Sequence, residues 1–513
     1  MADIKREIER KYEAPDADGD GGGLPDLTGV AGVATVADRG VAHLDATYYD
    51  TADERLAAHG ITLRRRTGGS DAGWHLKLPV APGEREEIHA PLSDTLPDEL
   101  AGLVRSRVRA AELLPVVRLR SDRAVRDLLD ARGRLLAEVG LDSVHAERLS
   151  GGVGDVHWTE IEVELADGGD PAFLDKVDKR LRKAGVRPSA AASKLARALA
   201  ETAPERTRGP APAGRNDRKP VSAGDHVLAY ARRQRDAIVD LDPAVRRDAA
   251  DSVHSMRVAT RRLRSTLKSF GAVLDRSVTD PIGDELKWLA GVLGEDRDRE
   301  VLAARLTAAL DEVGETDPDL VHGPVAERFG SWSGAGHSGA RGRILGVLDS
   351  RRYLTLLDTL DALLTDPPLR KAAGKQPHKV LAKAVRKDFR KVSALVAQAL
   401  QTDPGTDRDV ALHEARKKTK RTRYAAEAAA ASLGKPAKSM VKSMKSLQTL
   451  LGEHQDAVMA RVALRELSAV AHAAGEDTFT HGLLHEREQR RAADVEAALP
   501  AAWDGVKDAA TGL

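Results

Sequence analysis

The 513-residue chain contains no cysteine, which excludes disulfide bonds and thiolate metal ligands. Aromatic residues make up only 3% of it. The chain also lacks an excess of either charge, because 80 lysines and arginines stand against 79 acidic residues and leave a net charge of +1. An affinity for anions must therefore come from local clustering of cations and not from the total charge.

Long apolar runs are absent as well. No stretch of about 18 apolar residues occurs, so we expect no membrane partner. The first residues, MADIKREIERKYEAP, lack the apolar core of a signal peptide. Together with the absence of cysteine, these features predict a cytoplasmic protein. The apolar content of 42% is enough for real cores, and the length predicts two or three domains.

A polar segment rich in proline, glycine and charge, ETAPERTRGPAPAGRNDRKPVSAG, separates two regions of different periodicity. We predict a first domain over residues 1–203, a linker over 204–224 and a second domain over 225–508. Short alternating segments predict a mostly antiparallel β structure with few helices before the linker. The helical period after the linker predicts an all-α domain.

The second domain carries one basic pattern twice, offset by 159 positions. The two copies are His254, Arg257, Arg261, Arg264 and His413, Arg416, Lys420, Arg423. Steps of three, four and three residues place each quartet on one face of a helix. In the first copy Met256 and Leu263 fall on the opposite face, which predicts a helix with one buried side and one cationic side.

The duplication extends beyond the basic helices, since Gly294 in LKWLAGVLGEDRD matches Gly452 in SLQTLLGEHQD. We predict two tandem helical-bundle repeats, over about residues 225–365 and 375–508, with about four helices each. The Gly/Ser-rich segment 330–342 between them predicts a flexible insertion.

Further basic residues extend these faces or form helical rows of their own. They are Lys268, Lys417, Lys383, Arg386, Arg390, Lys438, Lys442 and Lys445. Because successive helical turns are about 5.4 Å apart, each row is a ladder of cations that suits an extended anion. A solvated surface face is the alternative interpretation of any single row. Repetition at identical spacing favours anion binding.

Ionisable side chains also share strand faces in the first domain. Glu7, Glu9 and Lys11 lie on one face of an alternating segment, and Glu160, Glu162 and Glu164 on one face of another. His75 shares a face with Lys77, and Arg85 with Glu87. A solvated outer face would explain such a pattern. If the strands instead close into a barrel with these faces inward, carboxylates suited to Mg²⁺ or Mn²⁺ would lie opposite cations suited to phosphate.

The segment EIERK at Glu7–Lys11 resembles the ExExK signature of the CYTH superfamily, the triphosphate tunnel metalloenzymes, which include class IV adenylate cyclases and thiamine triphosphatases. The resemblance covers residues 1–200. It continues through YYDTADERLAAHGITLRRR, GWHLKLP, REE at 85–87, EIEVEL at 160–165 and Ser193–Lys194. It implies an α+β fold, an antiparallel β tunnel or barrel with peripheral helices, followed here by the all-α domain of two tandem repeats.

The resemblance also implies a metal-dependent triphosphatase that acts on a triphosphate-type small molecule. Implied catalytic residues are Glu7, Glu9 and Lys11. Implied ligands of Mg²⁺ or Mn²⁺ are Glu7, Glu9, Glu138, Asp142, Glu162 and Glu164. Implied substrate-binding residues are Lys11, Arg64, Arg66, Lys77, Arg85, Arg120, Arg123 and Lys194. Alternation places Arg118 and Arg120 on the face opposite Arg123, and a β-bulge would be needed to reconcile them.

Residues 225–505 resemble the CHAD domain, the conserved histidine α-helical domain, through both basic helices and both LG segments. This resemblance implies binding of inorganic polyphosphate by the duplicated quartets and the further basic rows, and association with polyphosphate granules. A non-catalytic granule scaffold and an adenylate-cyclase-like tunnel remain alternatives. Nucleic acid is disfavoured as a partner, because almost no aromatic residues are interleaved with the basic rows and the apolar backs of the helices suit burial in a bundle.

Overall fold

A computed structural model describes residues 3–14, 24–152, 154–203 and 219–512. The chain forms two compact units, Met1–Asp217 and Arg218–Leu513. Most of the expected linker, residues 204–218, lies outside the described residues. The boundaries of the two domains and of the two repeats therefore stay predictions.

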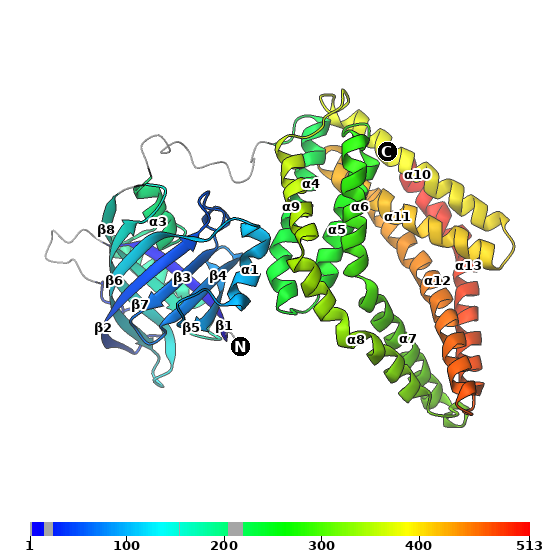
Figure 1. Ribbon diagram of the computed structural model, residues 1–513, viewed down its shortest axis with the longest axis horizontal. Helices are drawn as coiled ribbons and strands as arrows, with labels where there is room; N and C mark the ends of the chain where they lie inside the picture. The colour runs from blue at the N-terminus through cyan, green and yellow to red at the C-terminus, as the bar shows by residue number, and fades with distance from the viewer. Residues whose placement is uncertain (1–2, 15–23, 153, 204–218, 513) are drawn as a thin grey trace. The chain divides into compact units, whose positions relative to one another are not determined.

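The first unit is a ring of antiparallel strands (Figure 1). The strand order is β5-β4-β3-β2-β6-β7-β8-β1-β9, and β1 also pairs with β5, which closes β1 to β8 into a ring. The strands are β1 (Asp3–Glu13), β2 (Thr35–Asp50), β3 (Thr62–Thr67), β4 (Gly73–Ala81), β5 (Glu84–Pro91), β6 (Leu114–Leu129), β7 (Leu135–Arg148), β8 (Asp155–Leu165) and β9 (Arg187–Pro188). The expected α+β tunnel fold is confirmed.

Alternation divides the side chains of each strand between the inside of the ring and its outer face. Helices α1 (Asp98–Val108) and α2 (Ala172–Lys183) cover outward apolar residues, with Trp74 in the cluster of α1 and Ile161 in that of α2. Helix α3 (Lys194–Glu201) packs on inward-facing residues, among them Trp158. The part of the inner face that α3 does not cover carries ionisable groups.

Strand β2 and helix α1 have only weak signals in the sequence. Strand β2 has a register shift between Asp38 and Gly40, and most of its first half is exposed, so its alternation is weak. Helix α1 buries Leu100, Leu103 and Val104 but is short, which gives only three turns of helical period.

The second unit is formed by helices α4 to α13. They are α4 (Ala223–Arg246), α5 (Ser252–Ser269), α6 (Arg276–Val292), α7 (Glu295–Thr316), α8 (Val325–Asp349), α9 (Arg351–Thr365), α10 (Pro377–Gln401), α11 (Thr406–Leu433), α12 (Lys435–Ala473) and α13 (Phe479–Thr511). A capping box between Ser222 and Asp225 starts α4, and Pro377 starts α10. The expected all-α region is confirmed. None of the described helices combines the length and the hydropathy needed to span a membrane.

The sequence duplication reappears in the order of the helices. The two basic quartets lie on α5 and α11, each preceded by one long helix. Gly294 precedes the first residue of α7 and so marks a break between α6 and α7, whereas its counterpart Gly452 lies inside the continuous α12. The basic helix of the first copy is amphipathic as expected, since Met256, Leu263 and Phe270 are all buried.

The expectation of a flexible insertion over residues 330–342 is wrong, because this segment lies within α8. Glycine and serine have low helix propensity, but tertiary packing overrides it. Val325 and Phe329 pack in the smaller of two apolar clusters of this unit, and Leu348 packs in the larger one, so both ends of α8 are fixed.

Candidate functional site

Inside the ring, one group of ionisable side chains joins β1, β3, β4 and β5. The Lys77 ammonium lies 2.6 Å from Glu7, and Glu87 lies 2.8 Å from His75 and 3.6 Å from Arg64. All five come from the same face of their strands, because Glu7 pairs with Arg85 and Lys77 with Glu87 across neighbouring strands. The carboxylates of this group thus face cations at contact distance.

The pKa values of the neighbouring carboxyl groups of Glu7 and Glu87 shift in opposite directions. Burial and a hydrogen bond with Glu87 raise the pKa of Glu7 to about 8, although Lys77 opposes the shift. Burial would raise the pKa of Glu87, but Lys77, His75 and Glu7 lower it well below its usual range. The two carboxyl groups therefore titrate as a coupled pair.

A second group lies on β1, β6, β7, β8 and the start of α3. Arg123 donates both nitrogens of one guanidinium edge to Asp142, at 2.8 and 2.7 Å, and also contacts Glu162. The Lys194 ammonium lies 3.0 Å from Asp142, 2.7 Å from Glu160 and 2.6 Å from Glu162. Lys11 contacts Glu162 as well. Three cations thus meet three carboxylates in a buried space.

Local sequence explains how these side chains reach one another. Gly140 stands opposite Glu162 on the neighbouring strand, and a Cβ there would lie 3.2 Å from Arg123 Nε, so the glycine leaves room for the guanidinium. Ser193 accepts a hydrogen bond from Ala196 N at 3.1 Å and caps α3, which fixes Lys194 as its first residue.

Most of the predicted tunnel residues come together on the inner face. These are Glu7, Glu9, Lys11, Arg64, Arg66, Lys77, Arg85, Arg123, Glu138, Asp142, Glu162, Glu164 and Lys194. Arg120 does not join them. The pairing of β6 has no register shift between Val117 and Val125, so the bulge that would reconcile Arg120 with Arg123 is absent there. Arg120 lies on the outer face, 49% exposed, near Asp45 and Glu147.

The sequence places Glu87, His75 and Glu160 on ionisable strand faces but does not assign them a role in the site. Alternation alone places each of them beside a predicted residue, Glu87 next to Arg85 on β5, His75 next to Lys77 on β4 and Glu160 next to Glu162 on β8. The two-residue alternation of the strands is therefore enough to place these three side chains in the site.

The acidic residues can hold a divalent cation. One oxygen each from Asp142, Glu160 and Glu162 lies within 4.8 Å of the others. Carboxylate oxygens are hard ligands that suit Mg²⁺ and similar ions. The donor set of this group therefore fits the ion that the fold implies.

In the second unit, α5 packs against α11 and brings the duplicated quartets together (Figure 1). We call Arg257, Arg261, Arg416 and Lys420 the basic cluster. Burial and the nearby charges of Arg416, Arg261 and Arg257 lower the pKa of Lys420 to about 7. Equivalent residues of the two copies thus lie close enough to repel one another.

The repeated glycines make room for the repeated arginines. A Cβ on Gly294 would lie 2.5 Å from Arg257 Cζ, and one on Gly452 would lie 3.6 Å from Arg416. Asp456 lies 3.9 Å from Arg416, at the outer limit of an ion pair. Arg416 Nε is buried without a hydrogen-bond partner in the described part of the chain.

The remaining basic residues differ in their surroundings. Arg264 donates to the Gly283 carbonyl at 3.1 Å, and burial followed by the charge of Arg421 lowers the pKa of Lys268. Arg423 and Lys417 have acidic neighbours, Glu427 at 3.7 Å and Glu414 at 2.7 Å. His254 is exposed, and His413 is half-buried, with a pKa that burial lowers. Exposed on α10 and α12 are Lys383, Arg386, Arg390, Lys438, Lys442 and Lys445.

Comparisons with known proteins give two domain matches and a nearly full-length relative. The CYTH domain matches residues 5–199 and the CHAD domain matches residues 229–465. The uncharacterized protein Rv2226 of Mycobacterium tuberculosis is 38% identical over an alignment of 513 positions, which covers 96% of this chain and 95% of that protein. The CHAD domain from the plant Ricinus communis is 25% identical and covers 57% of this chain and 93% of its own, with a TM-score of 0.43. The putative adenylyl cyclase HpAC1 from Hippeastrum, described as having a dominant triphosphatase activity, is 19% identical and covers 39% of this chain and 98% of its own, with a TM-score of 0.25.

The two domain matches occur in the same order as the two folded units, and the relative from Mycobacterium tuberculosis covers nearly the whole chain. The chain belongs to the family of proteins in which a CYTH domain is followed by a CHAD domain.

Proposed function

We propose that this protein binds inorganic polyphosphate through its CHAD unit and binds and hydrolyses a triphosphate-type group in its CYTH ring with Mg²⁺ or Mn²⁺. The observation that carries the proposal is the segregation of charge in a nearly neutral chain. Buried cations and carboxylates alternate inside the ring, and like charges meet in the basic cluster. Both arrangements suit phosphate oxygens.

In the ring, the basic side chains would bind the phosphate oxygens and neutralise the charge that develops on the transferred phosphoryl group. One set of carboxylates forms ion pairs with Arg64, Lys77 and Arg85. The other set forms ion pairs with Arg123 and Lys194. The carboxylates would hold the divalent ion, which when bound supplies charge neutralisation and an activated water. Those we assign to this role are Glu7, Glu9, Glu138, Asp142, Glu162, Glu164 and, newly, Glu160.

Phosphate release from tripolyphosphate by the full-length protein tests the enzymatic part. We expect release that requires Mg²⁺ or Mn²⁺ and falls at least about 100-fold in Glu162→Gln. Arg120→Ala is the matched control, since Arg120 is an arginine of the same unit on the outer face. Absence of metal-dependent and Glu162-dependent turnover would leave the non-catalytic granule scaffold. Formation of cyclic AMP from ATP in the same reaction would instead favour the cyclase-like activity.

In the CHAD unit, an extended polyanion would contact both quartets at once. Each phosphate that enters the basic cluster would relieve the repulsion among Arg257, Arg416 and Lys420. The exposed rows on α10 and α12 would bind further phosphates of a long chain. Association with cytoplasmic polyphosphate granules would follow from this affinity.

Competition between labelled polyphosphate and nucleic acid tests the binding part. We expect polyphosphate to be displaced by unlabelled polyphosphate at far lower phosphate concentration than by single-stranded RNA or DNA, because few aromatic platforms accompany the basic residues. Equal displacement by RNA or DNA would favour a nucleic-acid partner.

A further inference from the structure

The outer face of the ring carries a group of metal-ligating side chains that the tunnel does not use. His145 on β7 pairs directly with His157 on β8, and Asp155 lies two residues before His157. We call His145, Asp155 and His157 the outer triad. Asp142 and Glu162 point into the ring, so residues at odd numbers on these two strands, the outer triad among them, point away from it.

The ligand atoms of the outer triad lie close enough together to approach one metal ion. Asp155 Oδ2 lies 3.5 Å from His145 Nε2 and 3.5 Å from His157 Nε2, and one ligand atom of each residue lies within 4.8 Å of the others. Ligands at about 2.0 to 2.1 Å from a tetrahedral Zn²⁺ are separated from one another by about 3.3 Å. Small side-chain rotations would therefore bring all three atoms to one ion.

Within the described residues, the polar contacts of these side chains are with one another. His145 Nε2 is buried and forms no hydrogen bond within the described residues, although the carboxylate of Asp155 lies close by. The two imidazole rings are stacked, with centroids 4.1 Å apart and planes at 16°. Across the part of the chain that the structure describes, the ion pairs of Asp155 are with these two histidines and not with a lysine or arginine, so its charge is available to a cation.

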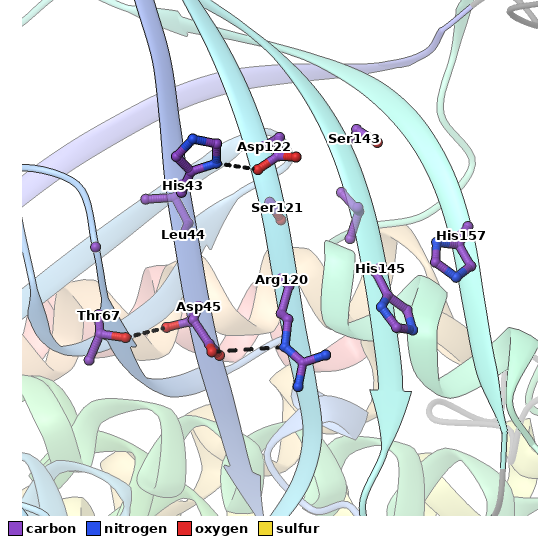
Figure 2. A pocket seen from close by; sticks show the side chains of 12 residues that line it. His43, Leu44, Asp45, Thr67, Arg120, Ser121, Asp122, Ser143, His145 and His157 are labelled. Carbon is purple, nitrogen blue, oxygen red and sulfur yellow. Dashed lines mark hydrogen bonds and ion pairs between the residues drawn. The ribbon is translucent and has the colours of Figure 1, made fainter.

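The site is open to solvent on one side. His145 and His157 also line a pocket of about 470 Å³, together with Arg120 and Asp122 (Figure 2). The side chain of His157 is 66% exposed, so an ion can enter without a change of fold. A fourth coordination position would be left for water or a small anion from the pocket.

We propose that the outer triad is a binding site for a divalent transition-metal ion of the zinc class, separate from the ion of the tunnel. Two imidazole nitrogens and one carboxylate oxygen form a donor set that prefers Zn²⁺, Co²⁺ or Ni²⁺ over Mg²⁺. The carboxylates of Asp142, Glu160 and Glu162 inside the ring prefer Mg²⁺ and similar hard ions instead. The two sites are therefore distinguished by the chemistry of their ligands.

Titration of the full-length protein with Zn²⁺ by calorimetry and with Co²⁺ by visible absorption tests this proposal. We expect one Zn²⁺ site that excess Mg²⁺ does not displace, and a Co²⁺ spectrum with the intensity of four-coordination. His145→Gln with His157→Gln should lose this site, with an affinity at least about 100-fold lower, because direct ligands matter more than the outer-shell partners whose loss costs 10- to 100-fold.

Matched variants separate the outer triad from other histidines and from the tunnel. Glu162→Gln, inside the ring, and His43→Gln, which lines the same pocket beside Asp122, should keep the Zn²⁺ site unchanged. Asp155→Asn should weaken it. Unchanged Zn²⁺ affinity and stoichiometry in the double histidine variant would overturn the proposal, as would loss of the site in Glu162→Gln alone. Both histidines lie on the outer face of regular strands, and equal melting temperatures without metal would show that the variants fold.

Discussion

The interior of the ring and the basic cluster of the helical unit both gather cations, but the neighbours of those cations differ. In the ring, Arg123 and Lys194 each contact at least two carboxylates. In the basic cluster, Lys420 faces other cations, and its pKa falls to about 7. The ring is internally neutralised, so a phosphate must exchange for existing ion pairs there. The basic cluster is strained by repulsion, so an anion relieves it.

Removing a cation should therefore destabilise the ring strongly. Arg123→Ala would leave the buried carboxylate of Asp142 with one fewer partner, and loss of one partner of a buried ion pair costs about 3 to 5 kcal/mol. Urea unfolding followed by a signal from the first unit would measure this loss. Arg120→Ala, on the same strand but exposed, should change the free energy of unfolding by less than about 0.5 kcal/mol. Equal effects of the two changes would contradict the comparison.

Removing cations from the basic cluster should instead affect binding and leave folding intact. Arg257→Ala with Arg416→Ala should weaken polyphosphate binding at least about tenfold and flatten its dependence on salt, as for other polyanions. Lys507→Ala, an exposed lysine beside Asp504, is the control. Unchanged affinity in the double variant would place the binding surface elsewhere.

The low pKa of Lys420 predicts that polyphosphate binding by the helical unit depends on pH. Polyphosphate affinity should fall as the pH rises from about 6 to 8.5, since Lys420 loses its charge near pH 7. In the free protein the sign of the stability effect is opposite. Between pH 7 and about 10 the unfolded chain keeps a proton that the folded chain releases, so the free energy of unfolding rises with pH. Lys420→Arg should remove both dependences, and a retained dependence would assign them to another group.

The smallest effects should come from the two glycines beside the arginines. Gly452→Ala adds an ordinary contact inside α12 and should stabilise the helical unit by about 0.5 to 1 kcal/mol. Gly294→Ala would place a methyl group 2.5 Å from the present position of Arg257 Cζ, so it should move that guanidinium and weaken polyphosphate binding severalfold. Thermal unfolding and polyphosphate titration of both variants measure the contrast. Identical behaviour of the two variants would show that the copies are equivalent at this position.

The sequence predicts the two units and most of the inner face of the ring for a simple reason. Period-two alternation and an ExExK signature need only local pattern, so the shared face of Glu7, Glu9 and Lys11 follows from their spacing alone. Spacing alone does not decide whether Arg120 lies on the same face as Arg123, because one β-bulge between them would change the face of one of the two. Only the observed pairing with β2 and β7 decides the register.

Other features depend on contacts between distant parts of the chain. The helical state of residues 330–342 follows from packing at the two ends of α8 and not from composition. The approach of Lys420 to Arg261 depends on how two helices cross, which spacing within one helix does not specify. The outer triad joins neighbouring strands at a hairpin whose register fixes His145 opposite His157.

The closure of the ring by β1 also sets an order of events during synthesis. Strand β1 pairs with β8 and with Arg187 and Pro188 of β9, and these partners leave the ribosome long after β1 does. Until then, β1 has unpaired backbone groups that could recruit another chain. Pairings of such large sequence separation form slowly, so nascent chains are exposed to misassembly until the first unit has been translated.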